Sequence, residues 1–300
     1  MEDLLIIGAG PAGMTAGLYA ARKGLTPLVV SRDIGGQATW SSSVENYMGF
    51  KDIRGSELMR RFEEHMKSQR LRYEECEVGR IAPAHGAFDV HCADGKTYSA
   101  RAVIVATGRQ PRTLDVPGEA EYRGKGVSYC ATCDGPLYRE ARVAVIGGGN
   151  AGLQACHDLL AIAAEVHLIT NEGITADQAV RDKVLGRPKL QLHEHHTVKA
   201  VLGKKMVEGV RIAGPDGRER DLAVEGVFIE VGLEPGSDLV GDAVGRNEAR
   251  EIVVDCECKT NVKGLFAAGD VTTACGEQII IAAGEGAKAA LAAAEYLAFH

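Results

Sequence analysis

The order strand, turn, helix, strand occurs twice in the hydrophobic pattern of the chain. The segments are 4–7, 14–23 and 27–30 in the first copy and 143–146, 153–164 and 166–169 in the second. The apolar runs do not alternate with polar residues, which is typical of parallel strands that are covered on both faces. The pattern therefore predicts an α/β protein with two related units.

The turn in each copy matches the spacing Gly-x-Gly-x-x-Gly, at 8–13 and at 147–152. Glycine at these positions lets the backbone approach a dinucleotide pyrophosphate, and the following helix presents free N–H groups to it. Asp33 and Glu172 each lie 25 positions after the first glycine of their motif, where an acidic side chain can bind a ribose. Two such sites imply two cofactors, most simply one flavin and one nicotinamide. The candidate residues of the turns are Gly8, Gly10, Pro11, Ala12, Gly13, Gly147, Gly149, Asn150, Ala151 and Gly152.

The duplication extends to the end of each unit. An apolar run that ends in glycine, with proline three residues later, occurs at 103–111 and again at 227–235. Turn-rich segments at 115–118 and 241–247 then mark the boundaries of the units. The remainder, 252–300, is too short for a third domain. We therefore expect it to return to the first unit, which makes the second unit an insertion.

Composition narrows the class of protein. The 300 residues include 34 Lys and Arg against 41 Asp and Glu, a formal net charge of −7. This excess of acidic residues argues against a nucleic-acid-binding protein, which would carry a positively charged surface. The uncharged stretch 4–21 contains four glycines and a proline, so we interpret it as strand, turn and helix, not as a membrane span. The acidic start lacks the features of a secretory signal, and we expect a cytoplasmic location without membrane association.

Cys130 and Cys133 form a Cys-x-x-Cys pair between the two units, followed directly by Asp134. In a reducing compartment such a pair indicates redox chemistry or zinc. The redox interpretation fits two dinucleotide sites, because hydride can pass from nicotinamide to flavin and two electrons can then enter the disulfide. Asp134 is the candidate acid/base for the exchange. Zinc needs four ligands, and Cys256 and Cys258 would have to supply the other two at a tight spacing.

The other cysteines and a histidine cluster receive simpler interpretations. Three cysteines are expected to be small buried apolar residues, namely Cys76, Cys92 and Cys156. Cys256 and Cys258 would share one face of a strand with Cα atoms about 6.5–7 Å apart, at the limit for a disulfide, so we expect no bond between them. The histidines at 193–196 are expected on a solvated strand or loop, and we assign no metal to the chain.

Taken together, the motifs resemble those of the low-molecular-weight thioredoxin reductase family. They are GAGPAG at 8–13, GGQ at 35–37, VENY at 44–47, ATG at 106–108, CATCDG at 130–135, GGGNAG at 147–152, TNVKGLFAAGDV at 260–271 and QIIIAAGEGAKAA at 278–290. The resemblance implies two Rossmann-like dinucleotide-binding domains, with the nicotinamide domain inserted into the FAD domain. It implies that 1–114 and 247–300 form the FAD domain and that 115–246 form the nicotinamide domain, which carries the CATC motif.

The resemblance also assigns roles to single residues. Cys133 matches the thiol that faces the flavin, Cys130 the thiol that attacks the partner, and Asp134 the acid/base. Asp270 matches the aspartate that binds the ribityl chain of FAD. The further residues expected to contact a cofactor are Ser31, Asp33, Gly36, Gln37, Asn46, Thr107, Gly108, Glu172, Gly232, Gly269, Gln278 and Ile279.

Three positions depart from the pattern of NADPH-dependent relatives. Those relatives carry a basic cluster after the second strand of the nicotinamide domain, where this chain has Glu172. A carboxylate would repel the 2′-phosphate of NADPH and bind the free 2′-hydroxyl of NADH, so we expect NADH to be favoured over NADPH. This stretch resembles the C-terminal half of the flavoprotein component of alkyl hydroperoxide reductase. Glu277 stands where relatives carry a basic residue, and Ser31 stands where many flavoproteins carry an acidic one, a role that Asp33 can take.

We therefore predict a FAD-dependent disulfide reductase of the thioredoxin reductase type. Two electrons would pass from NADH or NADPH through FAD and the Cys130/Cys133 pair to a thioredoxin-like or glutaredoxin-like protein. That partner is expected to be separate, because the sequence shows no thioredoxin-like domain, and the resemblance implies a homodimer. The alternatives are a ferredoxin-dependent thioredoxin reductase, a small-dithiol oxidase, or a non-enzymatic nucleotide- or zinc-binding regulatory protein on the same fold.

Overall fold

The computed structural model describes all residues except 42, 70 and 85 and divides the chain into two compact units. Unit 1 comprises Met1–Thr39, Tyr47–Gln110 and Glu234–His300, and unit 2 comprises Trp40–Asn46 and Pro111–Leu233. Two short strands, β7 (Arg109–Pro111) and β16 (Leu233–Pro235), pair with each other where the chain leaves unit 1 and returns to it.

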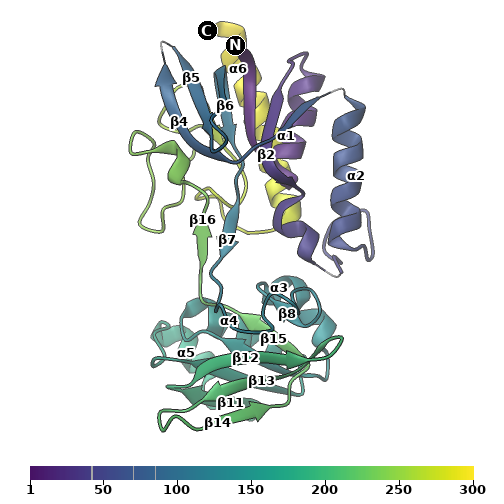
Figure 1. The fold of residues 1–300 in the computed structure, drawn as a ribbon, viewed down its shortest axis with the longest axis vertical. Helices are drawn as coiled ribbons and strands as arrows, with labels where there is room; N and C mark the ends of the chain where they lie inside the picture. The colour runs from purple at the N-terminus through teal and green to yellow at the C-terminus, as the bar shows by residue number, and fades with distance from the viewer. Residues whose placement is uncertain (42, 70, 85) are drawn as a thin grey trace. The chain divides into compact units, whose positions relative to one another are not determined.

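Unit 1 is built on a seven-stranded sheet in the order β3-β2-β1-β6-β5-β4, with β17 also paired to β6 (Figure 1). The strands are β1 (Glu2–Ala9), β2 (Leu28–Ile34), β3 (Arg72–Glu75), β4 (Val78–Ala84), β5 (Ala87–Cys92), β6 (Thr97–Val105) and β17 (Leu265–Ala267). One half of β6 pairs antiparallel with β5, through 97–100, and the other half pairs parallel with β17, through 103–105. The sheet therefore divides at β6, and β4 and β5 form an antiparallel layer of their own.

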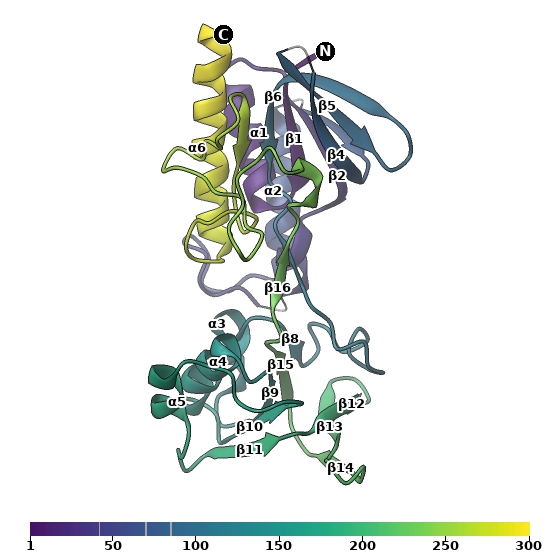
Figure 2. The same cartoon turned by 90° about the vertical axis from the view of Figure 1, so that its left-hand side faces the viewer.

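Both faces of the parallel strands in unit 1 are covered. Leu5 and Ile7 of β1 point into an apolar core that they share with Phe88 and Val90 of the antiparallel layer. The helices α1 and α6 pack against each other, as Figure 2 also shows, with α2 beside α1. The helices of the unit are α1 (Pro11–Arg22), α2 (Gly55–Ser68) and α6 (Ile279–Phe299), with short 3₁₀ helices at Gly36–Trp40 and Asp238–Val240. Burial on both faces explains why the strands are continuous apolar runs.

Unit 2 contains a parallel sheet in the order β11-β10-β9-β15-β8 and an antiparallel sheet in the order β12-β13-β14. The strands are β8 (Val127–Ser128), β9 (Arg142–Ile146), β10 (Glu165–Thr170), β11 (Leu190–Glu194), β12 (Thr197–Gly203), β13 (Val207–Ala213), β14 (Glu219–Leu222) and β15 (Gly226–Ile229). The helices are α3 (Ala131–Asp134), α4 (Asn150–Leu160) and α5 (Gln178–Val184), with a 3₁₀ helix at Gly135–Tyr138. Val143 and Val145 face α4, whereas Ala144 and Ile146 face β13, so this strand is also buried on both sides.

The strands and helices expected on either side of the two turns are present, with shifted helix ends. The first helix begins at Pro11 and not at 14, because proline fits the first helical position, where its missing N–H has no partner to lose. The second begins at Asn150 and ends at Leu160. The helix expected at the C-terminus runs over Ile279–Phe299.

The divisions between the units differ from the boundaries expected at 114/115 and 246/247. The structure places them at 110/111 and 233/234. Leu239, Val240 and Val244 are buried in the core of unit 1, so the segment after β16 packs with that unit although it is rich in turn residues. In the part of the chain that the structure describes, no helix is both long and apolar enough to cross a bilayer.

Candidate functional site

In the first glycine-rich turn, the outer two glycines allow close backbone packing, and the middle one leaves space for a ligand. Gly8 has a φ of +105°, and a Cβ there would lie 2.3 Å from the carbonyl oxygen of Ala106. A Cβ on Gly13 would lie 1.8 Å from the Gly8 carbonyl oxygen, whereas a Cβ on Gly10 would meet nothing within 4 Å. The outer glycines let β1 and α1 approach closely, and the middle one borders open space at the N-terminus of α1. A pyrophosphate can approach the helix N–H groups from that side.

The second turn repeats this geometry in unit 2. A Cβ on Gly147 would lie 2.2 Å from the carbonyl oxygen of Glu230, and one on Gly152 would lie 2.0 Å from the Gly147 carbonyl oxygen. The nearest atom to a Cβ on Gly149 would be the Thr175 hydroxyl oxygen, at 3.9 Å. The N-terminus of α4, which begins with Asn150 and Ala151, is thus open to an anionic ligand in the same way.

The loop after β10 is fastened to this second turn. The Asp177 N–H donates to Oδ1 of Asn150 at 2.8 Å, and Nδ2 of Asn150 donates to the Asp177 carboxylate at 2.9 Å. Two further N–H groups of the loop donate to the carbonyl oxygen of Gly148. Glu172 lies in this loop with an exposed side chain, and its carbonyl oxygen accepts from the Thr170 hydroxyl at 3.1 Å. These hydrogen bonds hold residues 175–177 against the turn and connect the Glu172 backbone to the end of β10.

Several segments expected to bind a cofactor meet at the first turn of unit 1. A Cβ on Gly36 would lie 3.7 Å from the Gly10 Cα, and one on Gly269 would lie 3.0 Å from the Cβ of Ala12. Thr107 follows β6 directly and donates its hydroxyl to the carbonyl oxygen of Gly236 at 2.7 Å. The turn, the 35–37 segment and the segment after β17 thus surround the N-terminus of α1.

The other expected cofactor residues lie at several places. Gln37 donates its side-chain amide to a backbone carbonyl at the start of β7, next to Gly108. Gln278 is the N-cap of α6, and Ile279 is the first residue of that helix. Asn46 belongs to unit 2, and so does Gly232, which has a φ of +112° just before β16. Gln37, Gln278 and Ile279 thus belong to unit 1, and Asn46 and Gly232 belong to unit 2.

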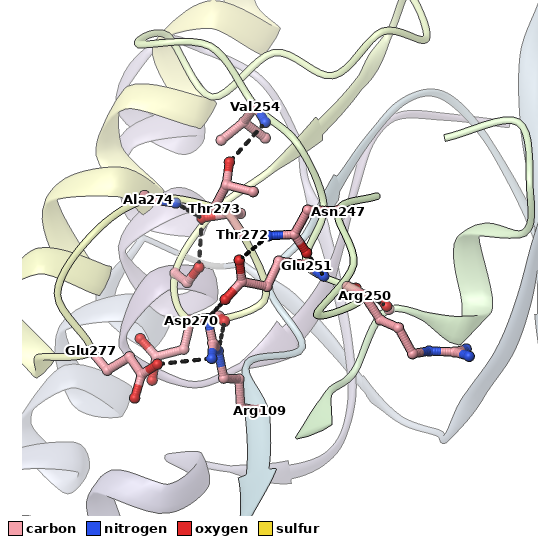
Figure 3. A network of polar contacts seen from close by, with 12 residues as sticks. Arg109, Asn247, Arg250, Glu251, Val254, Asp270, Thr272, Thr273, Ala274 and Glu277 are labelled. Atoms are coloured by element: carbon pink, nitrogen blue, oxygen red, sulfur yellow. Dashed lines mark hydrogen bonds and ion pairs between the residues drawn. The ribbon is translucent and has the colours of Figure 1, made fainter. Parts of the chain in front are cut away.

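Arg109 is the centre of a polar network in unit 1, which Figure 3 shows. Its Nε donates to the carbonyl oxygen of Asp270 at 2.6 Å, and its guanidinium forms ion pairs with Glu251 and, at 2.9 Å, with Glu277. Nδ2 of Asn247 donates to the Glu251 carboxylate, and Oδ1 of Asn247 accepts from the Glu251 backbone N–H. Glu277 therefore has a partner of opposite charge.

Asp270 is largely buried beside this network. Burial raises its pKa from 3.8 to about 6, the carboxylates of Glu277 and Glu285 act in the same direction, and Arg109 opposes them. The neighbouring Gly269 N–H donates to Glu285 at 2.7 Å, which holds the segment against α6. A carboxylate in this setting is stabilised by any hydroxyl group that donates to it, as a sugar alcohol of a ligand would.

The end of β2 carries the acidic candidate of unit 1. Asp33 is exposed and accepts from Nε of Arg32 at 3.2 Å. Ser31 is buried, and its carbonyl oxygen accepts from the Cys76 N–H at 3.0 Å and from the Tyr73 hydroxyl at 3.2 Å. Asp33 thus presents an exposed carboxylate at this strand end, whereas the side chain of Ser31 is buried.

The Cys-x-x-Cys motif forms a disulfide in unit 2. The Cα atoms of Cys130 and Cys133 are 5.3 Å apart. Cys130 is the N-cap of α3, and the Cys133 N–H points at the Cys130 sulfur from 3.1 Å. An N–H at a helix N-terminus stabilises a thiolate when the bond is reduced. The pair is arranged for two-electron exchange, and the four-cysteine zinc alternative loses two of its ligands.

Asp134 lies next to the pair as a partly buried acid. Its Oδ2 accepts from the Ser128 hydroxyl at 2.6 Å, and among the described residues its buried Oδ1 has no hydrogen-bond partner. Burial raises the pKa of Asp134, and the hydrogen bond from Ser128 opposes this effect. A carboxyl group that keeps its proton to higher pH is suited to protonate a departing thiolate.

The expectation that Cys76 and Cys92 are separate apolar residues is wrong. They form a second disulfide with Cα atoms 6.1 Å apart, although both are buried as expected. Cys156 is buried and free, as expected, and burial raises the pKa of its thiol. The pairing was not predictable, because the fold and not the spacing of 16 residues decides which cysteines meet.

Cys256 and Cys258 are both free, which agrees with the expectation that they form no bond. The expected strand, however, is a turn. The Asp255 carboxylate accepts from the backbone N–H groups of Glu257 and Lys259, each at 2.9 Å, and Cys258 has a φ of +65°. The hydrogen bonds to the Asp255 carboxylate therefore stabilise a local turn in place of the expected strand.

His193 was expected on a solvated strand or loop, but its side chain contacts two other side chains. It contacts His167 at 3.0 Å and Nη2 of Arg220 at 2.9 Å. Burial lowers its pKa to about 4, with His167 and Arg220 adding to the effect. β11 ends at Glu194 and His195 has a φ of +57°, so His193 and His195 do not share a strand face.

Four residues of these sites, namely Ser128, Glu230, Arg109 and Glu251, were not predicted from the sequence, because none of them has a role in the motifs. Ser128 lies two residues before Cys130. Glu230, which directly follows β15, accepts a hydrogen bond of 3.3 Å from the N–H of Ala131. Arg109 directly follows the ATG motif, and Glu251 is far from it in sequence. The one available signal was the charge of Arg109, which opposes that of Glu277.

Comparisons with known proteins place the chain among flavoprotein-type reductases. The pyridine nucleotide-disulphide oxidoreductase family matches residues 2–292. The F component of alkyl hydroperoxide reductase from Pseudomonas putida is 41% identical over 301 residues, and an NADH dehydrogenase from Bacillus subtilis is 37% identical over 297. Each match covers 98% of this chain and 58% of the relative, so the chain spans little more than half of their length.

A solved structure of similar fold is the thioredoxin reductase from Streptococcus pyogenes. It has a TM-score of 0.95 and 34% identity, and the match covers 100% of this chain and 99% of that one. The predicted α/β fold of the thioredoxin reductase type is thereby confirmed. The family match extends over nearly the whole length and confirms that the protein is an oxidoreductase, and the chain belongs to the pyridine nucleotide-disulphide oxidoreductase family.

Proposed function

We propose that the chain is a FAD-dependent disulfide reductase that passes two electrons from NADH to a thioredoxin-type protein through Cys130 and Cys133. The observation that carries the proposal is the disulfide between these cysteines beside the partly buried acid Asp134. Two dinucleotide-type turns in the same chain support the nucleotide requirement.

We assign FAD to unit 1 and the nicotinamide to unit 2. The Gly10 position would admit the pyrophosphate of FAD, Asp33 would bind its ribose, and Asp270 would accept a hydrogen bond from its ribityl chain. The open Gly149 position would admit the nicotinamide dinucleotide. Bound FAD would supply the chemistry that accepts a hydride and returns two electrons to a disulfide.

The residues of unit 2 would carry out the exchange with the partner. In the reduced pair, the Cys130 thiolate attacks one sulfur of the partner disulfide and releases the other as a thiolate. Asp134 provides a proton for a departing thiolate, and Cys133 then attacks Cys130 to restore the disulfide and release the second partner thiol. The partner disulfide is reduced to two thiols, and Cys130 and Cys133 return to the oxidised form.

NADH is the proposed donor because of the loop that carries Glu172. The Glu172 carboxylate is exposed where a ribose 2′-substituent is expected, and the nearby Arg181 donates to the carbonyl oxygen of Ile174. A negative charge at this place favours a hydroxyl over a phosphate. The name of the Bacillus subtilis relative, an NADH dehydrogenase, agrees with this choice.

The test is an anaerobic titration of the flavin-loaded protein with NADH and, separately, with NADPH, followed by the flavin absorbance band. We expect rapid bleaching by NADH and slow bleaching by NADPH. Glu172→Arg should reverse this preference and improve use of NADPH about tenfold or more, as expected for replacing repulsion by a charge-assisted contact. Asp182→Asn, which changes an exposed acid on α5, should leave the preference unchanged.

The result also separates the remaining alternatives. If neither nucleotide bleaches a flavin that dithionite reduces, the NADH assignment is wrong and a ferredoxin-type donor becomes the better candidate. A colourless protein that retains zinc instead would favour the non-enzymatic alternative. The homodimer, the cytoplasmic location and the thioredoxin-like or glutaredoxin-like partner stay predictions, because they concern surfaces and surroundings beyond these sites.

A further inference from the structure

The Cys76–Cys92 disulfide lies at the junction between two layers of unit 1. Cys76 directly follows β3, and Cys92 is the last residue of β5 in the antiparallel layer. Their Cα separation of 6.1 Å lies within the 4.4–6.8 Å that disulfides span, and each residue is 7% exposed. Both belong to the apolar core between the parallel sheet and the antiparallel layer. The bond therefore connects the two layers at one edge of their shared core.

One end of this bond is attached to the strand that carries the ribose candidate. The Cys76 N–H donates to the carbonyl oxygen of Ser31 at 3.0 Å, which extends the ladder between β2 and β3 beyond its last pair, Ser31 and Glu75. The Tyr73 hydroxyl donates to the same oxygen at 3.2 Å. Asp33 follows two residues later on β2. The cross-link thus fixes the backbone just before Asp33.

The other end is attached to a hairpin that water reaches. The Cys92 N–H donates to the carbonyl oxygen of Lys96 at 2.9 Å, and the Gly95 N–H donates to the carbonyl oxygen of Cys92 at 3.0 Å. Asp94 and Gly95 are exposed at the turn. Opening of this hairpin would therefore expose the Cys92 end of the bond to a dissolved reagent.

We propose that Cys76 and Cys92 form a second thiol–disulfide site, which takes a low-molecular-weight or protein disulfide as its oxidant and holds the end of β2 for the adenosine half of FAD. The bond forms when one thiolate attacks the external disulfide and releases one thiol, and the second cysteine then displaces the other. Two protein thiols are oxidised, and the external disulfide is reduced to two thiols that take up the two protons. The part that concerns FAD rests on the proposed function.

A metal site is the competing interpretation of the same residues. The two sulfurs and the Asp94 carboxylate all lie within 4.8 Å of one another, and two thiolates with a carboxylate are a donor set for a soft divalent cation such as Zn²⁺. Asp94, however, already accepts from the Lys96 N–H at 3.1 Å and pairs with its ammonium at 3.3 Å. These contacts and the Cys76–Cys92 bond favour the disulfide.

The first test maps the cysteines after incubation with oxidised glutathione, alkylation in denaturant and mass spectrometry without reduction. We expect a cross-linked peptide pair that contains Cys76 and Cys92. Alkylation of both cysteines, or release of one equivalent of zinc from the pair by a mercurial, would overturn the proposal. In a parallel sample, excess NADH should open Cys130–Cys133 and leave Cys76–Cys92 closed. If NADH opens neither bond, the proposed function fails while the second site stands.

The second test measures the affinity for FAD by the return of flavin fluorescence on dissociation. Cys76→Ala/Cys92→Ala should weaken FAD binding about tenfold, the effect of losing about one well-placed hydrogen bond. The control Cys256→Ala changes an exposed free thiol in the same unit and should bind FAD as the wild type does. Unchanged FAD affinity in the double variant would refute the link to β2.

A comparison without that variant covers the case in which it does not fold. Cys130→Ser/Cys133→Ser retains the second disulfide, so its oxidised and dithiothreitol-reduced forms differ in the Cys76–Cys92 bond. We expect the reduced form to release FAD about tenfold more readily, on the same reasoning. Equal affinities in the two forms would refute the effect on FAD, and a protein that binds no FAD in either form would refute the proposed function.

Discussion

Asp270→Asn in the flavin-free protein is the substitution whose effect on stability follows most directly from the structure. Burial, with Glu277 as the next contributor, raises the pKa of Asp270 from 3.8 to about 6. The native state therefore holds the proton more tightly than the unfolded chain does. As the pH rises from about 4 to about 6, the unfolded chain releases its proton first, and the free energy of unfolding decreases. Above about pH 6 the loss stays constant.

The size of the effect follows from the two pKa values. Each pKa unit corresponds to about 1.4 kcal/mol, so the raised pKa of Asp270 lowers the free energy of unfolding, relative to its value at low pH, by about 3 kcal/mol at pH 7.5 and by about 1 kcal/mol at pH 4.5. Asparagine has a similar shape and no charge. We therefore expect Asp270→Asn to be more stable than the wild type, and its advantage to grow by about 2 kcal/mol between these two pH values.

The assay is urea unfolding of both flavin-free proteins at several pH values. Unfolding is monitored by hydrogen exchange in peptides from β17 and α6. These peptides report unit 1 separately, which matters because two units need not unfold in one step. Asp242→Asn, at an exposed acid of the same unit, should show no such pH dependence. An Asp270→Asn variant that is no more stable at pH 7.5, or whose advantage does not change with pH, would contradict the reasoning.

Three further predictions concern the sites. Cys133→Ser should still allow NADH to reduce the flavin but should abolish reduction of a thioredoxin substrate; retained turnover in a coupled thioredoxin assay would refute the assigned role. Asp134→Asn should slow thiol–disulfide exchange by about 10²-fold and remove the decline of its rate toward high pH, because the acid with the raised pKa is gone; stopped-flow rates over pH would show this. Gly10→Ala should fold and lose FAD affinity, whereas Gly13→Ala should misfold, because only the second Cβ meets a backbone oxygen; circular dichroism and flavin content distinguish them, and two variants with equal folding would contradict this difference.

Sequence reasoning reached much of the chemistry because the decisive features are local. The two glycine spacings determine the turns, since Gly8 and Gly13 must lack a Cβ for strand and helix to approach, and this requirement is visible in the residues themselves. The Cys-x-x-Cys spacing brings Cys130 and Cys133 within bonding distance on a single turn of chain. The apolar runs follow from burial on both faces of a parallel sheet.

Other features depended on the tertiary structure, because they join residues that are distant in sequence. The Cys76–Cys92 bond forms because the antiparallel layer folds onto the parallel sheet, and the spacing of the two cysteines carries no sign of it. The pKa of Asp270 depends on burial and on Glu277, which no motif records. The return of the chain to unit 1 at Glu234 is decided by the packing of Leu239 and Val240 into that core. The sequence by itself determined the local turns, strands and redox pair, whereas only long-range packing decided which side chains share a low-dielectric environment and which sulfurs meet.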